Sequence, residues 1–238
     1  MAPSSPTLRR PDPMATRTTR RREALWPDVP EDRWNDWRWQ LSHRLATVDE
    51  LGRCLTLTEQ ERAAITAEGL FRIDLTPYLV TTMDPDDPND PIRRQVVPTV
   101  QEADAFDGLR VDSLGEAAHS AVNGLVHRYP DRVLMLVTTE CASYCRFCTR
   151  SRIVGDASQN FGPADHDAQI AYIAAHPEIR DVLLSGGDPL QLPTRVLDKL
   201  LTRLRAIPHV EIVRIGSRVP YFLPQRIDDE LVAVLAQH

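Results

Sequence analysis

The fold is decided by the stretch "RVLMLVTTECASYCRFCTR", residues 132–150. It opens with a short apolar and β-branched run, and this pattern predicts a buried strand over residues 132–139. Three cysteines follow at spacings of four and three residues, and they are Cys141, Cys145 and Cys148. A strand that runs directly into a loop of closely spaced thiols indicates an α/β protein with a metal centre at a strand end.

The three cysteines leave the type of metal centre open. A zinc site needs a fourth ligand, and His166 or His176 could supply it, although neither has a partner at ligand spacing. Iron–sulfur clusters are commonly held by four thiolates, so three thiolates around four irons would leave one iron open to an exogenous ligand. Cys54 is remote in sequence, and four cysteines make a poor disulfide framework for 238 residues. We therefore expect reduced thiols, a bound metal and a cytoplasmic location.

The chain after residue 131 alternates between predicted strands and helices. Apolar runs at 180–187 and 210–217 predict two further strands, and such alternation is typical of a parallel sheet covered by helices. The motifs "SGGDP" and "GSRVP" stand at the ends of these two strands, as the cysteines do at the end of the first. Because the carboxyl ends of parallel strands meet at one edge, we expect one site there. The predicted helices span residues 165–176, 194–207 and 227–237.

The chain before residue 127 has a different composition. The net charge of −6 conceals an arginine-rich arm, residues 1–30, for which we expect disorder; nucleic-acid binding through it is the less favoured interpretation. Residues 31–126 predict a helical region, since Trp34, Trp37 and neighbouring apolar residues recur at helical spacing, and this region ends in a proline-rich strap. No apolar run approaches the length of a membrane span.

Longer motifs extend the pattern beyond the cysteines. They read "WNDWRWQ", "MDPDDPNDPIRRQVVPT", "HRYPDRVLMLVTTECASYCRFCTRSR", "HPEIRDVLLSGGDPL" and "IPHVEIVRIGSRVPYFLPQRI", in this order. With Phe147 just before the last cysteine, they resemble the lysine 2,3-aminomutase family of the radical S-adenosylmethionine (SAM) superfamily. The resemblance runs from about residue 31 to residue 238. It implies a partial (β/α) radical SAM barrel, of which residues 127–238 would form only the first three strand–helix units.

The resemblance also implies cofactors and a reaction. Family members use a [4Fe-4S] cluster, SAM and pyridoxal phosphate (PLP) to move an amino group from Cα to Cβ of an amino acid. The three cysteines would hold the cluster. Gly186, Gly187 and Asp188 would take the methionyl amino group of SAM, because glycines permit close backbone approach and a carboxylate suits an ammonium. Ser217 and Arg218 would line the SAM pocket.

Other positions would serve PLP and the substrate. Arg128, Tyr129 and Arg132 in "HRYPDR" resemble PLP contacts, although Arg132 also suits an ordinary strand edge. Arg150 resembles the arginine that receives the substrate carboxylate. PLP enzymes hold their cofactor on a lysine, yet Lys199 is the one lysine here. It lies within a predicted helix away from the strand ends, so we interpret it as a surface residue and expect no PLP lysine in this chain.

The missing lysine and the unclosed sheet share one explanation, namely that the chain is the amino-terminal portion of a longer or truncated polypeptide. The substrate therefore stays open among lysine, glutamate and arginine. Two alternatives remain: a related enzyme that forms β-lysine for a translation factor, and a non-catalytic iron–sulfur or zinc-binding fragment. The family further implies an electron donor such as flavodoxin or ferredoxin, a homo-oligomer and no membrane association.

Overall fold

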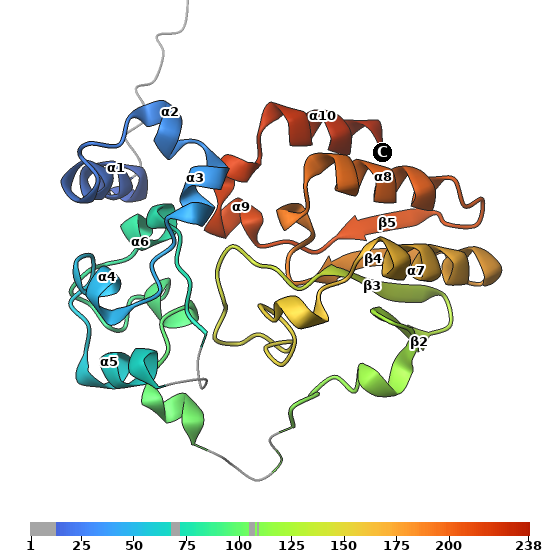
Figure 1. The fold of residues 1–238 in the computed structure, drawn as a ribbon, viewed down its shortest axis with the longest axis horizontal. Helices are drawn as coiled ribbons and strands as arrows, with labels where there is room; N and C mark the ends of the chain where they lie inside the picture. Colours follow the sequence, from blue (N-terminus) through green and yellow to red (C-terminus); the bar gives the residue numbers. More distant parts are fainter. Residues whose placement is uncertain (1–12, 68–71, 105–107, 109) are drawn as a thin grey trace, which may run out of the picture.

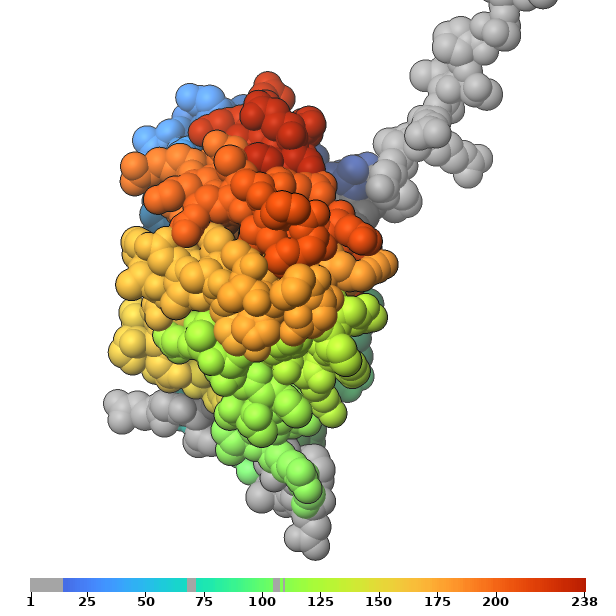
Figure 2. Space-filling model, turned by 90° about the vertical axis from the view of Figure 1, so that its right-hand side faces the viewer, coloured from blue at the N-terminus to red at the C-terminus, as the bar shows by residue number. Residues whose placement is uncertain are grey.

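The computed structural model describes residues 13–67, 72–104, 108 and 110–238. It is an α/β structure in which one five-stranded sheet, in the order β1-β2-β3-β4-β5, lies beside a group of short helices formed by the first part of the chain (Figure 1). In Figure 2 the segments from about residue 110 onward stack in chain order, from green to red. Among the described residues, no helix is long and apolar enough to cross a membrane.

Three strands of the sheet confirm the sequence prediction. They are β3 (Arg132–Thr138), β4 (Asp181–Gly186) and β5 (Ile212–Ile215). Both neighbouring pairs are parallel, and Leu134 lies opposite Leu183, which in turn lies opposite Arg214. The carboxyl ends of the three strands therefore meet at one edge of the sheet, as expected.

Two strands were not predicted. The strands β1 (Ser120–Val122) and β2 (Leu125–Tyr129) extend the sheet as an antiparallel hairpin beside β3. Their sequence, "SAVNGLVHRY", mixes polar with apolar residues, and the pattern of a fully buried strand does not occur in it. The predicted boundary between residues 126 and 127 falls inside β2, so it divides a strand and is wrong.

One face of the sheet is covered by helices. The helices α7 (Pro163–Ala175), α8 (Thr194–Arg205) and α10 (Asp229–Gln237) follow β3, β4 and β5 in turn. Four buried leucines of α8 recur at helical spacing and share one core with the buried residues of β3 and β4. Since side chains alternate across a strand, Leu134, Leu183 and Ser185 face the opposite side, where they are only partly buried.

The helical region is built from short pieces. The helical spacing of Trp34 and Trp37 does not correspond to one continuous helix, because Asp36 accepts a hydrogen bond from the Arg38 backbone N–H and caps a new helix. Thr47 and Glu50 form a capping box at the start of the helix that follows. The pieces are α2 (Glu31–Trp34), α3 (Trp37–Ser42), α4 (Val48–Gly52), α5 (Glu59–Thr66), α6 (Pro77–Thr82) and, after β5, α9 (Val219–Phe222).

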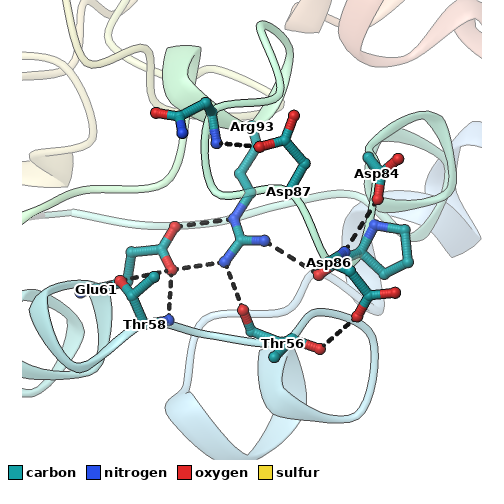
Figure 3. Close-up of polar contacts among 9 residues, drawn as sticks. Thr56, Thr58, Glu61, Asp84, Asp86, Asp87 and Arg93 are labelled. Carbon is teal, nitrogen blue, oxygen red and sulfur yellow. Dashed lines mark hydrogen bonds and ion pairs between the residues drawn. The ribbon is translucent and has the colours of Figure 1, made fainter.

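The proline-rich strap is held by one buried arginine. Arg93 Nε and Nη2 donate to the two carboxylate oxygens of Glu61 at 2.8 and 2.6 Å, and Nη1 and Nη2 donate to the backbone carbonyls of Pro85 and Thr56 (Figure 3). Thr58 caps α5 three residues before Glu61 and completes a capping box with it. This clamp, Glu61 with Arg93, fixes a segment in which prolines prevent regular structure. Short 3₁₀ turns lie at Arg93–Gln95, Val100–Ala103, Ala117–His119, Ala157–Gln159, Pro189–Gln191 and Pro224–Arg226.

The basic arm is ordered over part of its length. Helix α1 (Pro13–Leu25) packs against α6, so the prediction of disorder over residues 1–30 is wrong from Pro13 onward. Arg21 donates to the backbone carbonyls of Met83 and Cys54, at 2.5 and 2.6 Å. Backbone carbonyls at the end of α6 and just after α4 thus give the arginines internal partners, which composition does not reveal. Residues 1–12 lie outside the described residues.

Candidate functional site

The cysteine loop follows directly from β3 and is tied to the helical region. Arg44 Nη1 donates to the Cys141 carbonyl at 3.2 Å, and the Arg146 backbone N–H donates to the Gln95 carbonyl at 2.8 Å. All three loop cysteines are partly buried and unbridged. The irregular loop is therefore fixed by the first half of the chain, because it has no regular hydrogen-bond ladder of its own.

The surroundings of Cys141 and Cys145 favour the neutral thiols unless a cation is bound beside them. Burial raises the pKa of the Cys141 thiol, and Asp188 together with the other two thiols raises it further, while Arg44 acts in the opposite sense. Burial likewise raises the pKa of the Cys145 thiol, and Arg218 opposes that shift. Metal ligation requires thiolates, so a bound positive centre would favour the ionised form.

The donor set fits an iron–sulfur cluster. Three thiols stand on one loop of eight residues, and in a cluster each thiolate binds a separate iron, whereas a single ion needs all its ligands at one point. Within the described ranges, no group of three His, Cys, Asp or Glu side chains is close enough to hold one metal ion.

Gly186 and Gly187 are required by the packing of the protein itself. A Cβ at Gly186 would lie 2.2 Å from the Thr138 carbonyl oxygen, and one at Gly187 would lie 2.2 Å from the Glu140 carbonyl oxygen. The Gly187 N–H donates to Thr138 and the Asp188 N–H to Glu140, at 2.7 and 2.8 Å. The two glycines thus let the end of β4 cross the start of the cysteine loop, which is a structural reason for the pair besides the predicted contact with SAM.

Asp188 joins the loop after β4 to the loop after β5. Its Oδ2 accepts hydrogen bonds from Ser217 Oγ at 3.0 Å and from the backbone N–H groups of Arg218 and Val219 at 2.6 and 3.1 Å. Burial raises the pKa of the Asp188 carboxyl, and these donors, with the Leu190 N–H, oppose the shift. The structure therefore brings together Asp188, Ser217 and Arg218, as expected, although the carboxylate already has partners within the chain.

Arg218 completes the link back to the cysteines. Its guanidinium carbon lies 4.4 Å from the centre of the Phe147 ring, between Cys145 and Cys148 in sequence. Phe147 is half exposed, and Arg218 also lies near the Phe222 ring. The loops after β3, β4 and β5 hence meet in one place, where a stacked arginine supplies positive charge beside the thiols.

Arg128, Tyr129 and Arg132 form a separate group. The guanidinium carbons of Arg128 and Arg132 lie 6.0 and 5.8 Å from the centre of the exposed Tyr129 ring. Arg132 also pairs with Asp131 at 2.9 Å. The group lies at the turn before β3, and β3 is seven residues long, so roughly 20 Å of strand separates it from the cysteine loop. The structure does not bring these residues to the three strand-end loops.

Arg150 lies at the carboxyl ends of the strands, beside the cysteine loop. It contacts the side of the sheet that α7, α8 and α10 do not cover. Its Nη2 is 2.7 Å from Glu116 Oε1, and its Nη1 is 3.4 Å from Ser185 Oγ on β4. Sequence reasoning missed Glu116, because it stands in a polar segment without a periodic pattern. It missed Arg44 because the partner of Arg44, the Cys141 carbonyl, is 97 residues away and is fixed by tertiary packing. Lys199 is exposed on α8, as predicted.

The comparisons with known proteins agree with this arrangement. Residues 135–238 match the model of the radical SAM superfamily. The chain is 46% identical over 215 residues to an L-lysine 2,3-aminomutase of Bacillus subtilis, which covers 90% of this chain and 46% of that protein. The identity to the L-lysine 2,3-aminomutase of Clostridium subterminale is 47% over 219 residues, covering 92% of this chain and 53% of that protein.

A relative with a different printed substrate is also similar. A glutamate 2,3-aminomutase of Clostridioides difficile is 40% identical over 210 residues, covering 87% of this chain and 49% of that protein. The chain thus spans about half the length of the curated relatives it matches. With its three-cysteine loop after β3 and its Gly-Gly-Asp turn at the end of β4, the chain is similar to L-lysine 2,3-aminomutases over 90–92% of its own length, and it matches the radical SAM superfamily over residues 135–238.

Proposed function

We propose that this chain takes part in an amino-acid 2,3-aminomutase reaction, in which the α-amino group of lysine or a related amino acid moves to the β-carbon. The observation that carries the proposal is the meeting of the cysteine loop with the loops of Asp188 and Arg218 at the carboxyl ends of three parallel strands. Relatives named for lysine and for glutamate support an amino-acid substrate.

In this proposal each loop has its own task. Cys141, Cys145 and Cys148 would hold a [4Fe-4S] cluster. When bound, the cluster would supply the electron for reductive cleavage of SAM. The Gly186–Gly187 turn brings the β4 loop against the cysteine loop. Asp188 holds the loop of Ser217 and Arg218 beside it.

By resemblance to the family, we propose Arg128, Tyr129 and Arg132 as PLP contacts, although they lie at the other end of β3 from the cysteine loop. Two guanidinium groups beside an open tyrosine ring suit a phosphate-bearing aromatic cofactor. PLP, when bound, supplies the covalent attachment through which the amino group moves. The one lysine, Lys199, is exposed on the helix that covers the other side of the sheet, so we propose that this chain offers no lysine for PLP.

The architecture supports a partial (β/α) barrel. Each of the parallel strands β3, β4 and β5 is followed by a helix on one side of the sheet, and the other side is only partly covered. We propose that this sheet is the first half of such a barrel. By resemblance to the family, we also propose an electron donor of the flavodoxin or ferredoxin type and a homo-oligomer.

The test is SAM cleavage by the full chain after anaerobic reconstitution with iron and sulfide. We expect 5′-deoxyadenosine from the wild type under a strong reductant, and none from Cys145→Ala, because a cluster held by two thiolates does not persist. Cys54→Ala is the matched control: Cys54 is buried in the helical region, and this variant should keep the activity. Equal 5′-deoxyadenosine production by Cys145→Ala and the wild type would overturn the proposal.

A further inference from the structure

Arg150 is held on one side by a buried carboxylate. Its Nε and Nη2 atoms lie 2.9 and 2.7 Å from Oε1 of Glu116, and the Glu116 residue is 5% exposed. The other carboxylate oxygen, Oε2, accepts a hydrogen bond from Arg152 Nη2 at 3.1 Å. Both oxygens of Glu116 are therefore engaged, and the orientation of the Arg150 guanidinium group is fixed along its Nε–Nη2 edge.

The opposite edge of Arg150 has a weaker contact. Within the described part of the chain, Nη1 reaches Ser185 Oγ at 3.4 Å, which is long for a charged donor. Arg152 is near two carboxylates, because Asp112 Oδ1 lies 3.4 Å from it in addition to Glu116. Arg150 therefore pairs closely with one carboxylate along its Nε–Nη2 edge, and its Nη1 atom has only the long contact with Ser185.

The contact with Ser185 places the Nη1 side of Arg150 on the side of the sheet that α7, α8 and α10 do not cover. Ser185 is the residue of β4 directly before Gly186, it lies opposite Leu136 of β3, and it is only partly buried. Glu116 and Arg152, together with Leu136, also line a cavity of about 370 Å³. That volume is within the range of small-molecule sites, and the cavity adjoins the cluster at Glu116 and Arg152, whereas Arg150 and Ser185 do not line it.

We propose that Glu116 is a positioning residue, which holds Arg150 so that Nη1 of Arg150 and the hydroxyl of Ser185 together bind the carboxylate of the amino-acid substrate. The inference rests on the proposed function, since it concerns the substrate of that reaction. An unrestrained arginine side chain has about 2 kcal/mol of rotamer entropy to lose on binding. A guanidinium group already fixed by Glu116 avoids most of that loss, so the site is preorganised.

The test compares two probes that differ in the carboxylate alone, L-lysine and L-lysinamide. Calorimetric titration of the full, reconstituted chain should show tighter binding of L-lysine by the wild type. In Glu116→Gln, which keeps the side-chain shape, we expect the affinity for L-lysine to fall about tenfold while that for L-lysinamide stays the same. The control is Glu102→Gln, which removes the ion pair of Glu102 with Arg146 on the same loop and should leave both affinities unchanged.

A second pair of variants keeps the test decisive if Glu116→Gln folds poorly. Ser185→Ala should lower the preference for L-lysine about threefold, and Ser185→Thr, which retains a hydroxyl, should restore it. An unchanged preference in folded Glu116→Gln or in Ser185→Ala would overturn the inference, as would a wild type that binds both probes equally. SAM cleavage measured on the same preparations separates the two proposals. If the wild type does not cleave SAM, the proposed function is contradicted, and the preference for L-lysine over L-lysinamide still decides the inference about Glu116.

Discussion

Two arginine–carboxylate pairs in this chain have the same chemistry and different surroundings. In the clamp, the Arg93 side chain is 0% exposed and the Glu61 side chain 4%, and all three guanidinium nitrogens of Arg93 donate to acceptors within the chain at 3.1 Å or less. In the cluster beside the cysteine loop, Arg150 is 17% exposed, and its Nη1 atom has only a 3.4 Å contact.

The difference separates a structural pair from a site. A buried arginine whose three guanidinium nitrogens all donate within the chain holds the backbone around it and is not accessible to a ligand. An arginine that is fixed along one edge and has only a long contact on the other edge is rigid and still able to bind a ligand. The saturation of the guanidinium group, more than its burial, therefore indicates which pair has a functional task.

The largest effect should come from Arg93→Met. It leaves the Glu61 carboxylate buried without a cation, and breaking such a pair costs about 3–5 kcal/mol, so we expect a loss of that size in the free energy of unfolding, measured with urea. Adding Glu61→Leu should recover part of the loss, because no charge then stays buried. If the double variant were less stable than Arg93→Met, the two regions would not differ in the way described.

A smaller loss of stability is expected for Glu116→Gln. Hydrogen bonds to charged groups are removed, which costs about 1–3 kcal/mol, but Arg150 and Arg152 are 17% and 19% exposed and can be hydrated. The urea midpoint should therefore fall less than in Arg93→Met. A loss equal to that of Arg93→Met would mean that Glu116 mainly stabilises the fold.

The smallest effects concern the helix caps. Thr47→Ala and Thr58→Ala each remove an N-cap, which is worth about 1 kcal/mol. Thr58 should cost more, since its hydroxyl also contacts Glu61 Oε2, at 3.0 Å, and thereby supports the carboxylate that binds Arg93. Thermal unfolding of the two variants makes the comparison directly. A larger effect at Thr47 would show that the cap of α5 is independent of the clamp.

Much of the sheet and of the cysteine end could be predicted from local patterns. The apolar runs that form β3, β4 and β5 are long enough to be recognised, and the motifs that follow them must meet because parallel strands end at the same edge. The β1–β2 hairpin escaped prediction because its strands are short and mixed in polarity, so their pairing depends on β3 beside them.

The contacts made by long side chains could not be predicted. Glu116 binds Arg150, which is 34 residues away in sequence. Arg44 binds the Cys141 carbonyl, 97 residues away, and Arg21 binds the Met83 carbonyl, 62 residues away. Nothing in their neighbourhoods marks them, because the partner is fixed by tertiary packing alone. Gly186 and Gly187 are also required because they pack closely against the start of the cysteine loop. This requirement can be recognised only when the path of the backbone is known.

The most direct measurement is the metal content of the anaerobically reconstituted chain, together with its electron paramagnetic resonance spectrum before and after SAM is added. We predict four irons per chain and a spectrum of the reduced cluster that changes with SAM, since one iron of the proposed cluster would have no protein ligand. One zinc per chain, or an iron centre whose spectrum ignores SAM, would contradict the assignment of Cys141, Cys145 and Cys148 to a radical SAM cluster.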